Sequence, residues 1–459
     1  MIKLNIILKY DGVKMKLKKK ITYKRFIILG FLILIAVGTL LLTLPIASKD
    51  RSMTSLFDAL FTATSASCVT GLVVFDTFSH WSLFGQTVIL LLVQIGGLGV
   101  ISVISMFSIA LGRRIGLQER QLIAETAGNG QIGGMVRLIK RIFLITLIVE
   151  STGAVLLFIK FYPMLGVGRG IYYAIFHSVS AFCNAGFDLF GVRGEYASLT
   201  PFAGDVLVNV VIMLLIIIGG IGFPVWDDLI KKKLKFKKYD LHTKIVLCVS
   251  FILIFGGAAL FYIFERNASL GGMKGGTKIL SSLFQSVTAR TAGFNTVDLT
   301  KLSKSGSLLM TSLMAVGGSP ASTAGGIKTT TLAVLFLNAY AAARHTKSIT
   351  LFSRRLHDNV AEQAGAVITI FATAVFASLL FMCAKESAGA GDILFEIVSA
   401  AGTVGLAKTV TAAFLPASKI ILILLMFCGR VGGVTLMLSL AEKCDFAPVN
   451  RPEEKILIG

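Results

Sequence analysis

The chain has 459 residues, of which 55% are hydrophobic and only 15% are charged, and its mean hydropathy is +0.81. Soluble domains carry about 25% charged residues, so this composition excludes an ordinary soluble protein. The net charge of +21 would suit a nucleic-acid-binding protein, but 26 of the 45 Lys and Arg residues fall in four short segments between apolar runs. That placement is typical of the cytoplasmic loops of membrane proteins. We therefore expect a membrane protein with no nucleic-acid partner.

The chain begins with a basic segment, residues 1–25, that holds nine Lys and Arg residues and predicts a cytoplasmic N-terminus. Met15 opens a second lysine-rich start, so the native protein could begin at Met1 or at Met15. Further along, six apolar runs reach or pass the roughly 20 residues that cross a bilayer. They cover residues 26–46, 87–111, 142–161, 205–225, 245–264 and 417–440. The sequence thus predicts a multi-pass protein of the cell membrane, surrounded by lipid, with both termini in the cytoplasm.

Between the long runs, a short pattern of small and apolar residues that ends in a glycine occurs four times. The terminal glycines, Gly71, Gly186, Gly293 and Gly405, are 115, 107 and 112 positions apart. Each copy is too short to cross a bilayer but suits a re-entrant half-helix. Close helix packing would explain a single glycine of this kind, whereas four copies in register favour a pore loop.

The repeated pattern predicts the fold class and the organisation of the chain. We expect an all-α membrane protein of four pseudo-repeats, each a helix, a pore loop and a helix, around a single central pore. This makes eight spans plus four re-entrant half-helices. The repeats are expected at residues 26–112, 113–233, 234–348 and 349–443, followed by a cytoplasmic C-terminal tail at residues 444–459.

The four glycine-ending loops are the candidate ion-binding site. Non-helical backbone at membrane depth survives only where it lines water or is buried in protein. Four extended strands around one axis make a ring of carbonyl oxygens that can replace the water shell of a cation, and glycine permits the φ > 0 that aims a carbonyl inward. The expected filter residues are small or uncharged, which argues against a ring of carboxylates. They are Val69, Thr70, Gly71, Asn184, Ala185, Gly186, Thr291, Ala292, Gly293, Thr403, Val404 and Gly405.

The loop endings Val-Thr-Gly71, Asn-Ala-Gly186, Thr-Ala-Gly293 and Thr-Val-Gly405 resemble the filters of the Ktr/Trk/HKT superfamily of potassium transporters. The resemblance covers nearly the whole chain from about residue 23 onward. A Trk-type subunit would carry two extra spans before the first repeat, and the lysine-rich segment 1–25 leaves no room for them. The chain therefore resembles the Ktr branch and its KtrB-like ion-translocating membrane subunits.

The resemblance implies a potassium-uptake function with K⁺ at the filter residues as the transported ion. It also implies a homodimer and a cytoplasmic nucleotide-binding regulatory ring, the KtrA-like subunit. One glycine per loop suggests fewer ion sites than a potassium channel has, so sodium remains a possible second ion, coupled or stimulatory. The sequence offers neither a P-loop nor an aspartyl-phosphate motif. We expect no enzyme and no organic cofactor, and the alternative function is a secondary cation symporter (K/Na or K/H) of the same superfamily.

The second helices of the repeats carry a candidate pore barrier. Aligned from the filter glycines, Arg430 falls where the other repeats have Gly97, Gly220 and Gly318. An arginine at mid-membrane costs roughly 2.5–3.5 kcal/mol, so it should face water or a partner. We expect it to face the pore as a barrier to ions, in line with a matching arginine below the filter in the family. A salt bridge between two helices is the alternative.

The second helix of the third repeat carries a candidate gate. Its segment 317–331 is rich in glycine and holds a proline, which disfavours a regular helix. The resemblance implies a mobile gate beneath the filter, and a static kink is the alternative. Lys328 is a candidate latch to acidic or carbonyl groups. The expected gate residues are Gly317, Gly318, Ser319, Pro320, Gly325, Gly326 and Lys328.

One further arginine lies close to a filter loop. Arg290 stands three positions before Gly293, where the other repeats have Cys or Gly. A buried guanidinium needs a partner, and the acidic residues of the fourth pore helix are candidates. We expect Arg290 to pair with Glu396 or Asp392.

Overall fold

The computed structural model describes residues 23–111, 134–233, 235–346, 349–357, 359–408 and 411–432. The regular structure of these residues is helical, apart from one two-stranded hairpin in which β1 (Thr350–Leu351) pairs antiparallel with β2 (Arg354–Arg355). The all-α expectation is thereby confirmed. The N-terminal residues 1–22 and the expected C-terminal tail at residues 444–459 lie outside the described residues.

Four long helices pass through the molecule. They are α1 (Tyr23–Thr43), α6 (Met135–Phe182), α9 (Leu241–Glu265) and α13 (Val360–Cys383). Within the described ranges, these four are long and apolar enough to cross a membrane, and the number rises to six if each of two bent helix pairs counts as one span. The predicted total of eight spans therefore stays a prediction, and the run 417–440 extends beyond the described residues.

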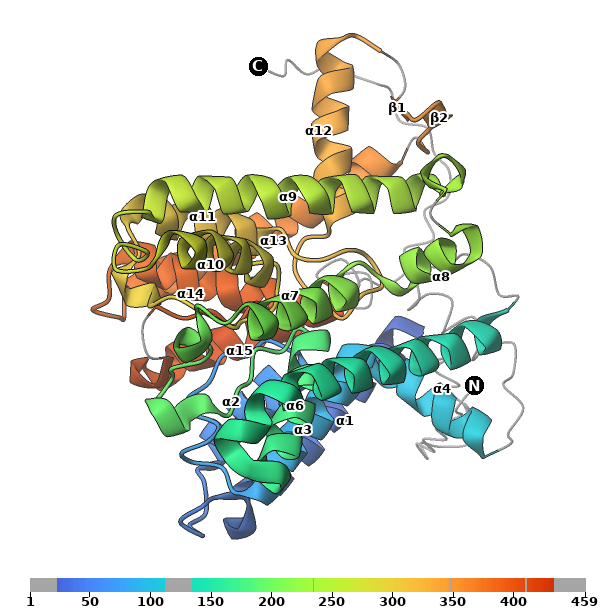
Figure 1. Cartoon of the computed structure of the whole chain (residues 1–459). Coiled ribbons are helices and arrows are strands. Elements are labelled where there is room, and N and C mark those ends of the chain that lie inside the picture. Colours follow the sequence, from blue (N-terminus) through green and yellow to red (C-terminus); the bar gives the residue numbers. More distant parts are fainter. Residues whose placement is uncertain are drawn as a thin grey trace, which may run out of the picture.

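Each long helix leads into a short helix that ends just before one of the four glycine loops (Figure 1). These short helices are α2 (Leu56–Ser67), α10 (Gly275–Thr288), α14 (Ala390–Gly402) and the last part of α6. In α6 the long and the short helix run together across a kink at Gly166, whose φ of 75° and ψ of −179° are not helical. The loops are followed by α3 (Leu83–Leu98), α7 (Val206–Gly220), α11 (Lys304–Ala315) and α15 (Pro416–Val431).

The helices that follow the loops break sharply. The chain bends by 92° between α3 and α4 (Val100–Ala110), and by 97° between α7 and α8 (Phe223–Lys232). Glycine stands at both bends, since Gly99 has a φ of +85° and Gly222 a φ of +97°. The apolar runs at residues 87–111 and 205–225 are therefore not single straight helices, because a positive φ at glycine turns the chain where hydropathy is continuous.

The third and fourth helices of this kind also end in irregular backbone. Between α11 and α12 (Thr329–Ala343) lies a segment with no regular helix, residues 316–328, which we call the intramembrane loop. The helix α15 ends at Val431 and is followed by Gly432, whose φ is +92°. Short 3₁₀ turns lie in the connections, at Pro45–Ala47, Phe190–Arg193, Thr200–Phe202, Phe236–Lys238, Leu299–Lys301 and Thr411–Ala413.

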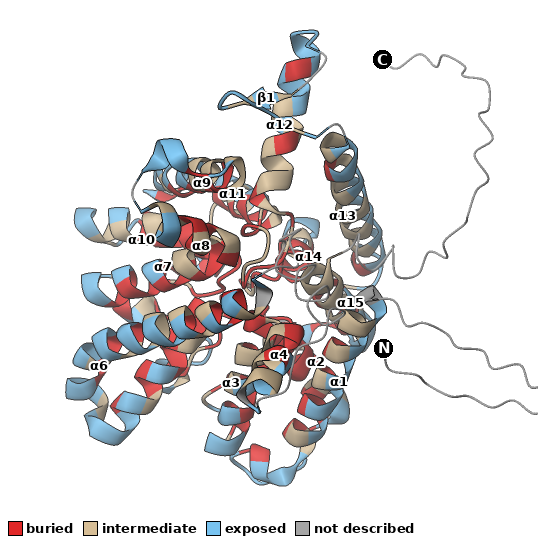
Figure 2. Cartoon of the chain, turned by 90° about the vertical axis from the view of Figure 1, so that its right-hand side faces the viewer, coloured by how far each residue is buried: buried red, intermediate tan, exposed pale blue. Residues whose placement is uncertain are grey.

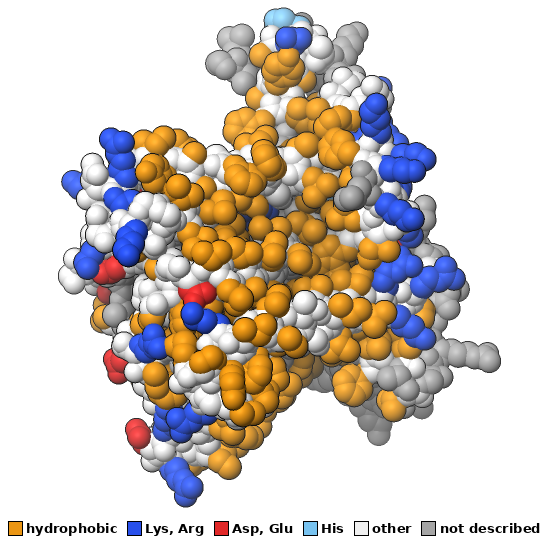
Figure 3. Space-filling model, in the orientation of Figure 1, with side chains coloured by type: hydrophobic (Ala, Val, Ile, Leu, Met, Phe, Trp, Pro, Cys, Tyr) orange, Lys and Arg blue, Asp and Glu red, His pale blue; other side chains and the backbone are white. Residues whose placement is uncertain are grey.

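The buried residues gather around the short helices rather than the long ones (Figure 2). Every residue of α2 from Phe61 to Ser67 is buried, and so is every residue of α14 from Phe395 to Gly402. By contrast, only 6% of the most apolar window of α13 is buried inside the molecule. Hydrophobic side chains cover much of the outer surface, with Lys and Arg toward its edges (Figure 3). Such a broad apolar surface would be unstable in water and is suited to lipid.

Candidate cation site

The four glycine loops share one unusual backbone conformation. The residue two positions before each glycine has a positive φ: 58° at Val69, 59° at Asn184, 73° at Thr291 and 53° at Thr403. The four glycines have φ values of 88°, 72°, 84° and 88° in chain order. A positive φ is uncommon for a residue other than glycine. Its recurrence at one position of all four loops shows that the loops are built alike.

The four loops contact one another in a closed cycle. A Cβ added to Gly71 would lie 2.3 Å from the carbonyl oxygen of Ala185, and one on Gly186 would lie 2.7 Å from that of Ala292. The cycle continues from Gly293 to the oxygen of Val404, at 2.6 Å, and closes from Gly405 to the oxygen of Thr70, at 2.1 Å. Real Cβ atoms do not approach an oxygen this closely, so only glycine fits at these four positions. The predicted filter residues therefore meet in a ring that follows the order of the chain.

Hydroxyl groups at the ends of the short helices hold the loops. The Oγ of Ser65 accepts a hydrogen bond from Gly71 N, and the Oγ of Ser399 accepts one from Gly405 N, both at 3.1 Å. In the other two loops the hydroxyl donates instead, from Ser180 to Phe187 O at 2.7 Å and from Thr288 to the carbonyl of the residue after Gly293 at 2.6 Å. Sequence reasoning assigned no role to these hydroxyls, although serine recurs six positions before the glycine in three loops.

A cavity of about 650 Å³ opens on one side of the ring. All four glycines line it, and its charged lining residues are Asp76, Asp188, Asp298, Lys301 and Lys408. We call this cavity the vestibule. Burial raises the pKa of Asp188 to about 7, although the hydrogen bond that Phe190 N donates to its carboxylate opposes the shift. The charge of the vestibule is therefore set partly by a carboxyl group that titrates near neutral pH.

On the other side, the second helices approach the short helices very closely. A Cβ on Gly96 would lie 2.0 Å from the carbonyl oxygen of Ser67, and one on Gly219 would lie 2.0 Å from that of Phe182. The fourth repeat has the same contact, at 2.2 Å, between Gly429 and the oxygen of Ala401. In these three repeats the residue that supplies the carbonyl stands four positions before the filter glycine. Their second helices are thus in register, and the aligned Gly97, Gly220 and Arg430 follow these glycines.

The intramembrane loop lies against the same side of the ring. A Cβ on Gly325 would lie 2.1 Å from Thr403 Oγ1, and one on Gly326 would lie 3.2 Å from the Cα of Gly402. Toward the second repeat, Ser319 N donates to Gly220 O at 3.0 Å, and Pro320 O lies 2.6 Å from a Cβ placed on Gly222. The loop is therefore packed between the second and fourth repeats.

Contacts within the intramembrane loop hold its two ends together. Gly317 N donates to Ile327 O at 2.8 Å, and Thr329 N donates to Gly318 O at 3.1 Å. The Lys328 ammonium donates to Ala324 O at 2.7 Å and to Gly325 O at 3.3 Å. Of the two kinds of partner expected for Lys328, the structure thus places carbonyl groups within reach.

Arg430 joins three segments through backbone carbonyls. Its guanidinium donates to Thr323 O in the intramembrane loop and to Gly96 O at the end of α3, and it donates to Gly97 O at 3.0 Å. Over the described ranges, no carboxylate pairs with Arg430. In the described part of the chain, carbonyl oxygens at broken helix ends thus stand where the salt-bridge alternative expects an acid.

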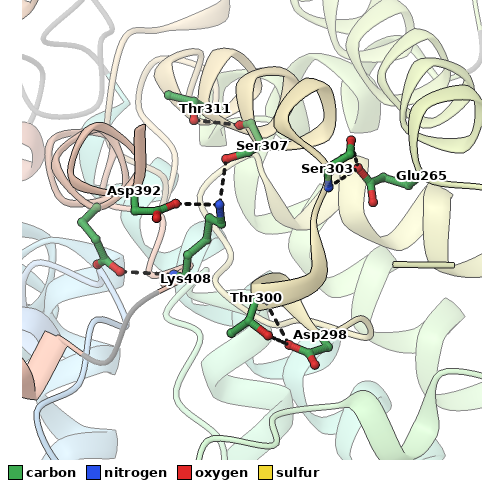
Figure 4. Close-up of polar contacts among 9 residues, drawn as sticks. Glu265, Asp298, Thr300, Ser303, Ser307, Thr311, Asp392 and Lys408 are labelled. Atoms are coloured by element: carbon green, nitrogen blue, oxygen red, sulfur yellow. Dashed lines mark hydrogen bonds and ion pairs between the residues drawn. The ribbon is translucent and has the colours of Figure 1, made fainter. Parts of the chain in front are cut away.

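The expected pairing of Arg290 is also wrong. Arg290 donates to Ser250 Oγ at 3.1 Å, in the long helix α9 of its own repeat. Asp392 instead pairs with Lys408, at 2.6 Å, and Glu396 accepts a hydrogen bond from Lys408 N at 3.2 Å (Figure 4). The segment after Gly405 thus occupies both carboxylates, which a search by residue charge alone could not foresee.

Comparison with known proteins agrees with this geometry. The family described as "TrkH: Cation transport protein" matches residues 14–446. The chain is 37% identical over 454 residues to the potassium/sodium uptake protein NtpJ of Enterococcus hirae, covering 97% of this chain and 99% of that one. It is also 37% identical over 442 residues to the Ktr system potassium uptake protein B of Bacillus subtilis, covering 96% and 97%.

A solved structure shares the fold. The crystal structure of the potassium transporter TrkH from Vibrio parahaemolyticus matches with a TM-score of 0.72 over 93% of this chain and 87% of that chain, at 18% sequence identity. The resemblance stated from the loop endings is confirmed by the family match and by the two relatives. The chain belongs to the TrkH family of cation transport proteins.

Proposed function

We propose that the chain is the pore-forming subunit of a Ktr-type system that takes up potassium across the bacterial plasma membrane. The closed cycle of the four loops carries this proposal. It brings the carbonyls of Thr70, Ala185, Ala292 and Val404 to the glycines of the neighbouring loops, around one axis. Such a ring of backbone oxygens can replace the water shell of a monovalent cation. Two relatives, NtpJ and the Ktr protein B, are named for potassium uptake.

The architecture that goes with this function is four pseudo-repeats around a single pore, with eight spans and four half-helices. Each repeat has a long helix, a short helix, a loop with two positive φ values and a second helix. The short helices end at the ring, so the partial negative charge of their C-terminal ends lies near the ion. The basic segments between repeats favour cytoplasmic termini. In this orientation the vestibule faces the outside.

The intramembrane loop and Arg430 form the control point of the proposed pore. The loop packs against the ring on the side away from the vestibule, and its glycines leave it without a regular helix. Arg430 holds the carbonyl of Thr323 and adds a positive charge there. A cation about 6 Å from this charge would meet a barrier of roughly 3 kcal/mol at an effective dielectric near 20. The loop is the gate, and Arg430 is a barrier that also tethers it.

The proposed system includes a second kind of subunit. Proteins B and D of the Bacillus subtilis Ktr system are named as parts of a system, which supports a separate regulatory subunit. We expect a KtrA-like nucleotide-binding ring at the cytoplasmic face and a homodimer of this chain. Sodium enters as a second permeant or stimulating ion, since NtpJ is named for potassium and sodium.

Rubidium uptake into liposomes that hold the purified chain tests the function. We expect saturable uptake that external K⁺ inhibits strongly and Na⁺ weakly, with no fixed stoichiometry to protons. A folded, inserted chain with no rubidium flux would refute the proposal. Uptake that requires a proton or sodium gradient in fixed ratio would instead establish the secondary cation symporter.

A further inference from the structure

Two lysines line the vestibule together with the filter glycines. A fixed positive charge at the entrance of a cation pathway repels the ion that must enter. Each lysine is paired with a carboxylate: Lys301 Nζ lies 3.3 Å from Asp298 Oδ2, and Lys408 Nζ lies 2.6 Å from Asp392 Oδ1. The pairs thus offset both positive charges of the vestibule lining.

The two pairs differ in their surroundings. The side chains of Lys301 and Asp298 are 73% and 45% exposed, and such a surface pair contributes little. The side chain of Lys408 is only 15% exposed, and that of Asp392 is 38% exposed. Lys408 also follows Gly405 by three residues, a stretch of backbone that spans at most about 10 Å. Lys408 is therefore the cation of the vestibule lining that stands next to a filter loop in the chain.

The ammonium of Lys408 is held by two different helices. It contacts Asp392 in the first turn of α14, and it donates to Ser307 Oγ in α11 at 3.4 Å (Figure 4). The backbone N–H of Lys408 is fixed separately, since it donates to Glu396 Oε1 at 3.2 Å. Loss of the Asp392 charge would therefore leave the ammonium only its 3.4 Å contact with Ser307, while the backbone stays in place.

A freed lysine is a competitor for the ring. Its ammonium is a compact monovalent charge with three N–H donors on a four-carbon stem. A ring of carbonyls that replaces the water shell of a cation can accept those donors as well. We propose that Asp392 determines access to the filter by holding the ammonium of Lys408 against α14, out of competition with external potassium. This inference rests on the proposed function.

Rubidium uptake at graded external K⁺ tests the inference with four variants. Asp392→Asn should raise the half-saturating K⁺ concentration roughly three- to tenfold, as expected for a nearby screened like charge. Because the freed ammonium competes with K⁺ for the same ring, high external K⁺ should restore the maximal rate. Lys408→Met alone should keep a half-saturation at or below that of the wild type, and the double variant should return to the value of Lys408→Met.

The matched control is Asp298→Asn, which makes the same chemical change at the exposed pair. It should leave half-saturation within about twofold of the wild type, since exposed pairs are weak. Where Asp392→Asn does not insert, Asp392→Glu serves instead. It should shift half-saturation in the same direction by less, and Lys408→Met should remove that shift.

Three results would overturn the inference. The first is an Asp392 variant whose half-saturating K⁺ concentration equals that of the wild type. The second is a raised half-saturation that Lys408→Met does not reverse, and the third is a loss of uptake in Lys408→Met alone. A wild-type chain that takes up no rubidium refutes the proposed function and the inference with it. If the wild type transports rubidium and Asp392→Asn has the same half-saturation, only the inference is refuted.

Discussion

Replacing Gly405 with serine should disable one quarter of the proposed filter. The φ of Gly405 is +88°, and a residue with a Cβ in the left-handed region costs roughly 1–2 kcal/mol. The new Cβ would also lie 2.1 Å from Thr70 O, whereas ordinary contact begins at 3.4 Å. The carbonyl of the first loop must therefore move by more than 1 Å, as these two distances show.

The magnitude follows from what that carbonyl contributes. We take the contact of this carbonyl with the cation as comparable to a hydrogen bond to a charged group, which contributes roughly 1.5–3 kcal/mol. Its loss should raise the half-saturating K⁺ concentration about ten- to a hundredfold, at 1.4 kcal/mol per tenfold. The preference for K⁺ over Na⁺ should fall as well, because the displaced carbonyl leaves a ring whose spacing no longer fits K⁺. Serine at Gly293, where the nearest oxygen is 2.6 Å away, should act in the same direction but less strongly.

The assay is rubidium uptake against K⁺ and Na⁺ in liposomes, with the inserted fraction of each variant measured in parallel. Gly391→Ser is the matched control, because Gly391 lies in α14, the short helix that leads into the loop of Gly405, and a Cβ there meets nothing within 4 Å. The control should behave as the wild type. If Gly405→Ser kept both the parental half-saturation and the parental K⁺/Na⁺ ratio, the assignment of the filter would be wrong.

Four further predictions concern the gate, the vestibule and the packing of the second helices. Deleting part of residues 317–326 should raise rubidium uptake and weaken its dependence on the regulatory subunit, measured with and without that subunit. Arg430→Ala should also raise uptake, and it should weaken that dependence in part, because the guanidinium tethers Thr323. Asp188, whose pKa burial raises to about 7, should ionise and lower the half-saturating K⁺ concentration as the external pH rises through neutrality, and Asp188→Asn should abolish this change. Gly96→Ala should reduce the yield of inserted, monodisperse protein in size-exclusion chromatography, because its Cβ would lie 2.0 Å from Ser67 O.

The sequence was sufficient to place the ring residues. The pattern before Gly71 recurs at Gly186, Gly293 and Gly405, and the structure brings the four loops into one cycle. A repeat carries this information because each copy must make the same turn. The bends at Gly99 and Gly222 were not predicted, since hydropathy measures how long an apolar run is and not its direction.

The partners of the buried arginines were beyond reach of the sequence for another reason. The sequence shows which residues carry charge, so it suggests an acid as the partner of Arg290 and, in the alternative to a pore barrier, of Arg430. The structure places a serine hydroxyl beside Arg290 and backbone carbonyls beside Arg430. Carbonyl groups occur at every residue, and only a broken helix leaves them free to accept. Which carbonyls are free depends on the three-dimensional fold.

The cyclic order of the loops has a consequence for how such a ring can evolve. A ring of four identical subunits repeats every substitution four times, whereas one gene that encodes all four quarters can change each of them separately. Each loop contacts the next one in the chain, and the fourth contacts the first. The second and fourth loops therefore lie across the axis from each other. Asp188 follows the second loop and Lys408 follows the fourth. The vestibule can therefore carry opposite charges on its two sides, an arrangement that fourfold symmetry would forbid.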